Sequence, residues 1–152
     1  MNGCGPRPGS RVRRLAVRLW FIYLCVAMLA PGEAFAAARG WLHLPHADKL
    51  AHAGLYGVWV LLLLWERAGS KGRTGPADRW RAALLAAAAG GAFELAQAAT
   101  GYRSADAWDF AADAAGCAAA ALAEWVAVRG STRKGPVAWG KRLTAPLPTG
   151  RS

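Results

Sequence analysis

Four long apolar segments limit what this chain can fold into. They lie at about residues 15–31, 50–65, 81–99 and 107–128 of a 152-residue chain that is 55% hydrophobic and only 18% charged. A helix of roughly 20 apolar residues crosses a bilayer core about 30 Å thick, whereas soluble domains usually carry about 25% charged residues. No amphipathic period of about 3.6 residues follows these segments, which disfavours the alternative of buried helices in a soluble bundle. The sequence therefore predicts an all-α integral membrane bundle of four transmembrane helices.

The same pattern predicts the organisation of the chain. A membrane domain is expected over residues 15–128, preceded by a basic cytoplasmic tail at 1–14 and followed by a disordered basic cytoplasmic tail at 129–152. The segments at 81–99 and 107–128 are rich in alanine and glycine. Because small residues let helix backbones approach closely in lipid, we expect these two helices to pack inside the bundle.

Basic residues mark alternate loops. The chain has 19 Lys and Arg against 9 Asp and Glu, a net charge of +10, and only Arg39, Lys49 and Arg103 fall outside the alternate loops that carry the others. The positive-inside rule then predicts a multi-pass plasma (cell) membrane protein with both termini in the cytoplasm. The charge is read as a topology signal and not as a nucleic-acid site, because no groove-reading element accompanies it.

An alternative concerns the first segment. Its basic start, its short apolar stretch and the sequence Ala34-Phe35-Ala36 are also typical of a cleavable signal peptide over residues 1–36. Cleavage would leave three transmembrane helices and an extracytoplasmic N-terminus. The three cysteines have no paired spacing, so neither a disulfide framework nor a zinc knuckle is expected.

With this topology, polar residues gather at the extracytoplasmic helix ends. Spacings of three and four place residues on one helix face, which predicts one polar stripe on each of three helices. The stripes are Asp48, Lys49, His52 and Tyr56; Glu94 and Gln97; and Asp109 and Asp113, with Arg103 in the turn and Asp106 near it. Because ionisable groups facing lipid cost about 2.5–3.5 kcal/mol each, we expect the stripes to face inward and form a functional site.

Simpler interpretations exist for some of these residues. Asp48 would serve as a helix N-cap beside a snorkelling Lys49, and Asp106 would stabilise the dipole of the fourth helix. His52 would be a hydrogen-bonded bundle residue. Asp48, His52, Glu94 and Asp109 would together hold a divalent metal, but a lone histidine with scattered carboxylates is weak evidence, so no metal and no cofactor are expected.

These residues, at these spacings, resemble the VanZ-like family of small bacterial membrane proteins. The resemblance covers residues about 45–125 and consists of DKLAH at 48–52 followed by Tyr56, ELAQ at 94–97, and RSADAWDFAADAAG at 103–116. The family usually has Asn where this chain has Asp113, which adds a carboxylate here. The resemblance implies a cell-envelope role that touches a membrane lipid or a lipid-linked cell-wall precursor, linked to teicoplanin-type glycopeptide resistance.

Three hypotheses follow for the site. In the first it is enzyme-like, with acid–base groups at His52, Glu94, Asp109 and Asp113, while Lys49 and Arg103 hold a phosphate or head group and Asp48, Tyr56 and Gln97 complete the substrate contacts. In the second the same residues bind or transport a ligand, or relay protons, without covalent chemistry. In the third a satisfied polar network locks the bundle. The sequence leaves open whether the protein is an enzyme.

Overall fold

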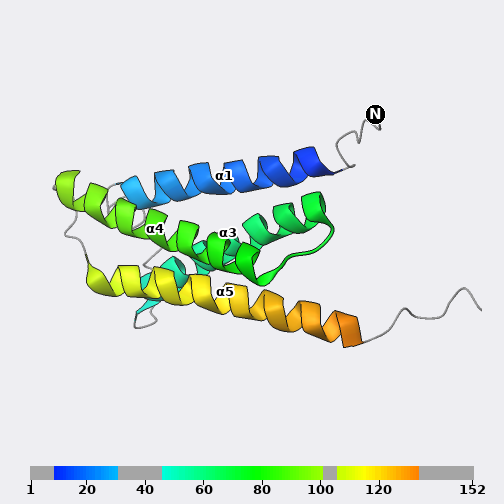
Figure 1. Cartoon of the computed structure of the whole chain (residues 1–152). Coiled ribbons are helices and arrows are strands. Elements are labelled where there is room, and N and C mark those ends of the chain that lie inside the picture. Colours follow the sequence, from blue (N-terminus) through cyan, green and yellow to red (C-terminus); the bar gives the residue numbers. More distant parts are fainter. Residues whose placement is uncertain (1–8, 31–45, 101–105, 134–152) are drawn as a thin grey trace, which may run out of the picture.

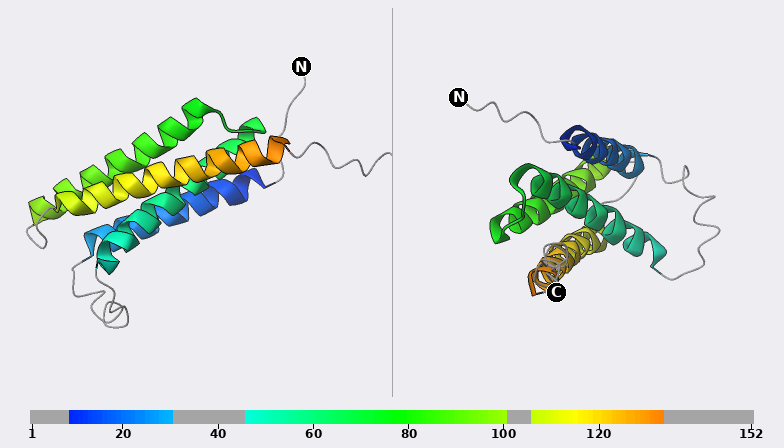
Figure 2. Two further views of the ribbon diagram at one scale, coloured as in Figure 1. Left: turned by 90° about the horizontal axis from the view of Figure 1, so that it is seen from below. Right: turned by 90° about the vertical axis from the view of Figure 1, so that its right-hand side faces the viewer.

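The computed structural model describes residues 9–30, 46–100 and 106–133, and within these ranges every regular element is a helix (Figure 1). The helices are α1 (Ser10–Leu29), α3 (Ala47–Lys71), α4 (Pro76–Thr100) and α5 (Ala107–Arg133). They run alongside one another in alternating directions (Figure 2). Arg103, the 101–105 turn and Ala34-Phe35-Ala36 lie outside the described residues.

Three helices are long and apolar enough to cross a membrane, at Ala47–Lys71, Pro76–Thr100 and Ala107–Gly130. This confirms the all-helical prediction for the described residues and is compatible with a multi-pass membrane protein. Helix α1 is not among the three, because every 18-residue window within it contains Arg13, Arg14 and Arg18. The predicted fourth transmembrane helix is therefore not established by length and composition.

The helices are longer than the apolar segments that predicted them, and at the end of α3 and the start of α4 capping residues set the boundary. Helix α3 ends at Lys71 and is followed by the C-cap Gly72, whose φ of 86° is the left-handed conformation that favours glycine. Helix α4 starts on Pro76, which suits a first helical position, and an Asp78 oxygen accepts the N–H of Gly75 at 3.1 Å. Helix α5 continues to Arg133, past the predicted boundary at residue 128.

Helix α3 is the central helix. It packs against all three others and most extensively against α5, and in the end-on view of Figure 2 it lies between α1 and α5. Trp20 of α1 donates its indole N–H to the Leu55 carbonyl at 3.0 Å, and Phe21 stacks on Trp59 with 5.2 Å between ring centroids. The alanine-rich helices were expected to be the inner ones, but the helix with the large apolar side chains occupies the centre.

The small residues of α5 instead allow its close approach to α3. A Cβ on Gly116 would overlap the carbonyl group of Ala53. On the facing helix, a Cβ on Gly57 would lie 3.2 Å from the Gly116 carbonyl oxygen. The two backbones are thus in contact at this crossing, the arrangement that small residues permit between membrane helices.

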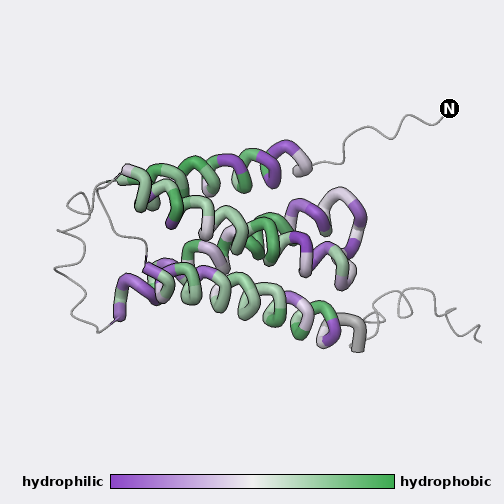
Figure 3. Tube along the Cα trace, turned by 60° about the vertical axis from the view of Figure 1, so that its left-hand side comes forward, coloured by the Kyte–Doolittle hydropathy of each residue, from purple (hydrophilic) through white to green (hydrophobic). Residues whose placement is uncertain are grey.

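Hydrophilic residues concentrate towards the helix ends and hydrophobic ones fill the middle (Figure 3). One end holds the first turns of α3 and α5 and the last turns of α4, and carries most of the described acidic side chains. The opposite end holds most of the basic ones, and there Arg13 lies over the Trp65 ring at 5.4 Å from its centroid. The two ends are called the acidic end and the basic end below.

The close crossing yields a stability prediction. Gly116→Ala should lower the stability of the full-length protein by about 1–3 kcal/mol, the usual cost of overpacking, because α3 and α5 must separate. Gly54→Ala, on the same pair of helices but with nothing within 4 Å of the new Cβ, should be neutral or slightly stabilising. Thermal unfolding in detergent measures both, and equal melting temperatures for the two variants would contradict the packing described.

Candidate functional site

The acidic end brings side chains from three helices into one group. Six residues make up this polar cluster, and it extends from the partly exposed edge of the helices into their buried interior: Lys49 and His52 of α3, Glu94 of α4, Asp106 before α5, and Asp109 and Asp113 of α5. The sequence predicted this convergence for all of them except Asp106, which it assigned to the helix dipole. The structure thus brings Glu94, Asp109, Asp113 and His52 close together, and their role as a functional site stays a prediction.

Lys49 is the cation of the cluster. Its Nζ lies 2.8 Å from Asp109 Oδ1, 3.0 Å from Asp106 Oδ2 and 3.7 Å from Asp48 Oδ2. The side chain therefore turns towards α5 instead of snorkelling outward. The simpler alternative of Asp48 as an N-cap is wrong, because α3 begins at Ala47 after an N-cap at His46, whose φ is 61°. Asp48 lies in the first turn, with about half of its side chain exposed.

His52 lies between two carboxylates of α5. Its Nδ1 is 3.0 Å from Asp113 Oδ1, and its Nε2 is 3.9 Å from Asp109 Oδ2. All three residues are buried, Asp113 with only 1% of its surface exposed. A carboxylate that accepts a hydrogen bond from one ring nitrogen fixes the tautomer of the histidine and so determines which nitrogen can accept or donate a proton. The pair fits a structural hydrogen bond, and it equally fits a proton-transfer group.

Glu94 and Gln97 are buried on α4 but have different partners. Glu94 Oε2 accepts the backbone N–H of Asp106 at 3.0 Å, which links the end of α4 to the start of α5. The Gln97 side-chain amide donates to the carbonyl of Met28, near the end of α1. The second contact ties α4 to α1, and a role for Gln97 in substrate binding stays a prediction.

Tyr56 continues the His52 face one turn deeper. It is fully buried in the apolar core, and its hydroxyl has no hydrogen-bond partner among the described residues. A buried hydroxyl without a partner costs free energy, so this position is not explained by packing alone. A substrate contact for Tyr56 stays a prediction.

Asp106 caps α5, as the dipole interpretation expected. Its Oδ1 accepts the N–H of Trp108 at 2.8 Å, and its other oxygen meets Lys49. The Trp108 N–H, and after it the Lys49 ammonium, hold the pKa of the Asp106 carboxyl below its usual range. One side chain thus stabilises a helix end and positions the cation of the cluster.

The basic end contains a second set of contacts that the sequence analysis missed. Lys71 Nζ lies 2.8 Å from Asp78 Oδ1, and Thr74 and Arg79 both contact the carboxylate of Glu124. From the sequence, Lys71 and Arg79 were interpreted only as topology signals, and their acidic partners were therefore not predicted. One signal in the sequence could have revealed part of this set: Asp78 follows Gly75 by three residues, the spacing at which an acidic side chain caps the start of a helix.

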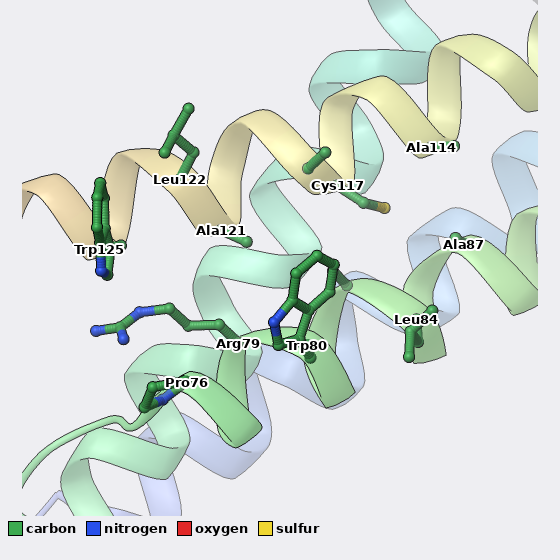
Figure 4. Close-up of a pocket in the computed structure, with 12 residues that line it drawn as sticks. Pro76, Arg79, Trp80, Leu84, Ala87, Ala114, Cys117, Ala121, Leu122 and Trp125 are labelled. Carbon is green, nitrogen blue, oxygen red and sulfur yellow. The ribbon is translucent and has the colours of Figure 1, made fainter.

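A groove of about 460 Å³ lies between α4 and α5 and runs from Pro76 and Trp125 at the basic end to Ala87 and Ala114 near the middle of the helices (Figure 4). Alanines and Leu84 form much of its wall, together with Trp80 of α4 and Trp125 of α5. Its lining is apolar apart from the Cys117 thiol and from Arg79, which already contacts Glu124. The polar cluster, in contrast, gathers several ionisable groups and is therefore the candidate functional site.

No family model, no curated protein and no solved structure matches this chain. The interpretation of the site therefore depends on the contacts described above and on the residues that suggested the family resemblance.

The cap at α5 can be tested with two variants. Asp106→Ala removes the acceptor for Trp108 and the partner of Lys49, and should lower the melting temperature. Asp106→Asn keeps an acceptor for the N–H but loses the charge, and should fall between Asp106→Ala and the wild type. Asp48→Asn is the control, because its contact with Lys49 is longer, at 3.7 Å, and should have a smaller effect.

The lowered pKa fixes the sign of the pH dependence. The stabilisation from the Asp106 carboxylate is present above its unfolded pKa of about 3.9 and is lost as the pH falls through its lower folded value. The difference in melting temperature between wild type and Asp106→Asn should therefore shrink at low pH. Thermal unfolding from pH 7 downward measures it, and a difference that grows on acidification would contradict the assignment.

Proposed function

We propose that this chain is a VanZ-like integral protein of the plasma (cell) membrane whose polar cluster binds and acts on the head group of a membrane lipid or a lipid-linked cell-wall precursor. One observation carries the proposal: a buried histidine, His52, lies between Asp109 and Asp113 at the end of three helices apolar enough to cross a membrane. Ionisable groups at such positions are costly and usually mark function.

The exposure of the cluster suits a ligand that arrives from the membrane surface. Asp106 and Lys49 are partly exposed, at 43% and 26% of their side chains, whereas His52 and Asp113 are buried, at 6% and 1%. A head group would meet Lys49 first, where an ammonium attracts phosphate or carboxylate oxygens. The acid–base groups lie one turn deeper, where exclusion of water strengthens electrostatic interactions.

The arrangement favours proton transfer as the chemistry. Asp113 at Nδ1 orients the ring of His52, and Asp109 and Glu94 supply further carboxylates beside it. A positioned general acid or base contributes roughly 10²–10⁴-fold to a reaction rate. In this proposal His52 moves the proton, Asp113 positions it, and Lys49 binds the head group together with Arg103. By the family resemblance, such a reaction would connect to glycopeptide resistance.

A structural role is the second candidate, because two contacts of the region join helices without needing a ligand. Glu94 accepts the Asp106 N–H, and Gln97 donates to the Met28 carbonyl. These contacts alone would lock α4 to α5 and to α1. The two candidates differ in the expected effect of replacing an ionisable side chain by an amide of similar size. Such a change preserves helix contacts that depend on hydrogen bonding and packing, but it removes acid–base chemistry.

The proposed orientation places the acidic end outside the cell and the basic end in the cytoplasm, following the positive-inside rule. Helix α1 is proposed as a fourth span, with its arginines at the basic end, where Arg13 lies over Trp65. Its apolar part exposes large side chains suited to lipid: Leu19 at 57%, Ile22 at 57% and Val26 at 59%. Both termini are then cytoplasmic.

Cysteine labelling tests this topology. In a background with all three native cysteines changed to Ser, Thr100→Cys should react with a membrane-impermeant maleimide in intact cells. Arg73→Cys, between α3 and α4, should react only after permeabilisation. Ser10→Cys should behave like Arg73→Cys if α1 spans the membrane. Labelling of Arg73→Cys but not of Thr100→Cys in intact cells would reverse the orientation and remove the proposed access from outside.

The function is tested with purified full-length protein in nanodiscs and labelled cell-envelope lipids. Wild type should retain and convert one lipid class, and His52→Gln and Glu94→Gln should lower the conversion by roughly 10²–10⁴-fold while leaving the melting temperature near that of wild type. Glu66→Gln, a carboxylate change on α3 away from the cluster, should be unaffected. Retention without conversion would favour a binding protein. A loss of folding in both cluster variants, without any lipid bound by wild type, would favour the structural role.

A further inference from the structure

The polar cluster brings together three of the four residues that the sequence analysis considered, on weak evidence, as metal ligands. His52, Glu94 and Asp109 each offer one ligand atom, and the three atoms lie within 4.8 Å of one another. The residues come from three different helices and all are buried. Imidazole nitrogen and carboxylate oxygen bind Zn²⁺ at about 2.0–2.2 Å, so two ligands of one ion lie about 3–4 Å apart. The 3.9 Å between His52 Nε2 and Asp109 Oδ2 fits this separation.

Each of the three side chains is held through its other polar atom. Asp113 contacts Nδ1 of His52, which leaves Nε2 directed towards Asp109. Lys49 contacts Oδ1 of Asp109, and Oδ2 is the oxygen that faces the histidine.

The third group follows the same rule. The backbone N–H of Asp106 donates to Oε2 of Glu94, and this hydrogen bond fixes the orientation of the carboxylate. Outer contacts of this kind orient the ligands of metal sites: a carboxylate on the far nitrogen of a histidine, and hydrogen bonds to ligating carboxylates.

The electrostatics of the cluster favour an added cation. Among the described residues, five carboxylates gather at the acidic end around one lysine, namely Asp48, Glu94, Asp106, Asp109 and Asp113. The unpartnered, fully buried hydroxyl of Tyr56 lies one turn from His52 and within electrostatic reach of Glu94 and Asp113. Buried polar groups in this excess normally have a counter-charge or a ligand.

We infer that His52, Glu94 and Asp109 bind a divalent first-row transition-metal ion of the Zn²⁺ or Mn²⁺ type. The mixed nitrogen and oxygen donors suit these ions better than Mg²⁺ or Ca²⁺, which prefer oxygen alone. Three protein ligands leave at least one coordination position for water or for a phosphate oxygen. That last consequence rests on the proposed function, whereas the metal site itself does not. With the ion bound, both ring nitrogens of His52 are occupied, so the proton-transfer role of His52 proposed above applies to the metal-free protein.

The experiment uses full-length protein without an affinity tag, in nanodiscs, stripped with EDTA and then dialysed against Zn²⁺ or Mn²⁺. Elemental analysis should find about one ion per chain for wild type. His52→Gln, Glu94→Gln and Asp109→Asn should each lower the affinity at least tenfold. His46→Gln and Glu66→Gln, matched changes outside the cluster, should keep it. No stoichiometric uptake by wild type, or equal uptake by the cluster variants, would overturn the inference.

A second measurement decides the matter if the cluster variants do not fold. The chain has three histidines, so changing His43 and His46 to Gln leaves His52 as the only imidazole. X-ray absorption of the Zn²⁺-loaded double variant should show one imidazole among oxygen ligands, and the ion should raise the melting temperature. A spectrum without imidazole would refute the site. Because neither readout uses a lipid substrate, failure of the metal site and failure of the lipid function are separate results.

Discussion

The backbone contact between α3 and α5 is the constraint on which the site depends. Gly116 has no side chain at the point where it meets Ala53, so the two helices come closer than larger residues would allow. His52 is the neighbour of Ala53, and Asp113 lies one turn before Gly116. Aspartate has a short side chain, so it bridges to a histidine on another helix only where the backbones are this close. The 3.0 Å contact between His52 and Asp113 is therefore a consequence of the glycine crossing.

A second glycine serves the same site from α4. A Cβ on Gly90 would lie 2.8 Å from an oxygen of Asp113. The space left by the missing side chain is thus occupied by the carboxylate that holds His52. Small residues in these helices do more than permit packing, since they leave room for buried polar side chains where a larger residue would exclude them.

The two ends of the helices use charge differently. At the basic end, the acidic side chains Asp78 and Glu124 each meet a basic partner, Lys71 and Arg79 respectively, and these pairs join neighbouring helices. At the acidic end, Lys49 forms ion pairs with three carboxylates at once. Burial of an excess of like charge is costly, and membrane helices usually tolerate it only where it has a use. This contrast supports the proposal that a ligand binds at the acidic end and not at the basic one.

The sequence by itself determined the helical class, three of the four predicted apolar spans and the set of polar residues at one end. Apolar length, the alternation of basic loops and spacings of three and four are local properties of the chain, and they do not depend on how helices pair. The spacing of His52, Glu94, Asp109 and Asp113 thus predicted the side chains that meet. It did not predict the extra turns at the helix ends, because caps such as Gly72 and Asp78 act through backbone geometry and not through hydropathy.

Only the tertiary structure decided which atoms face one another. That α3 is the central helix follows from its contacts with all three others, and no pattern within a single helix contains this information. The assignment of Asp113 to one ring nitrogen of His52 and of Asp109 to the other depends on the crossing at Gly116. The same holds for the three possible metal ligands, which are scattered over more than fifty residues of sequence and become neighbours only when three helices pack.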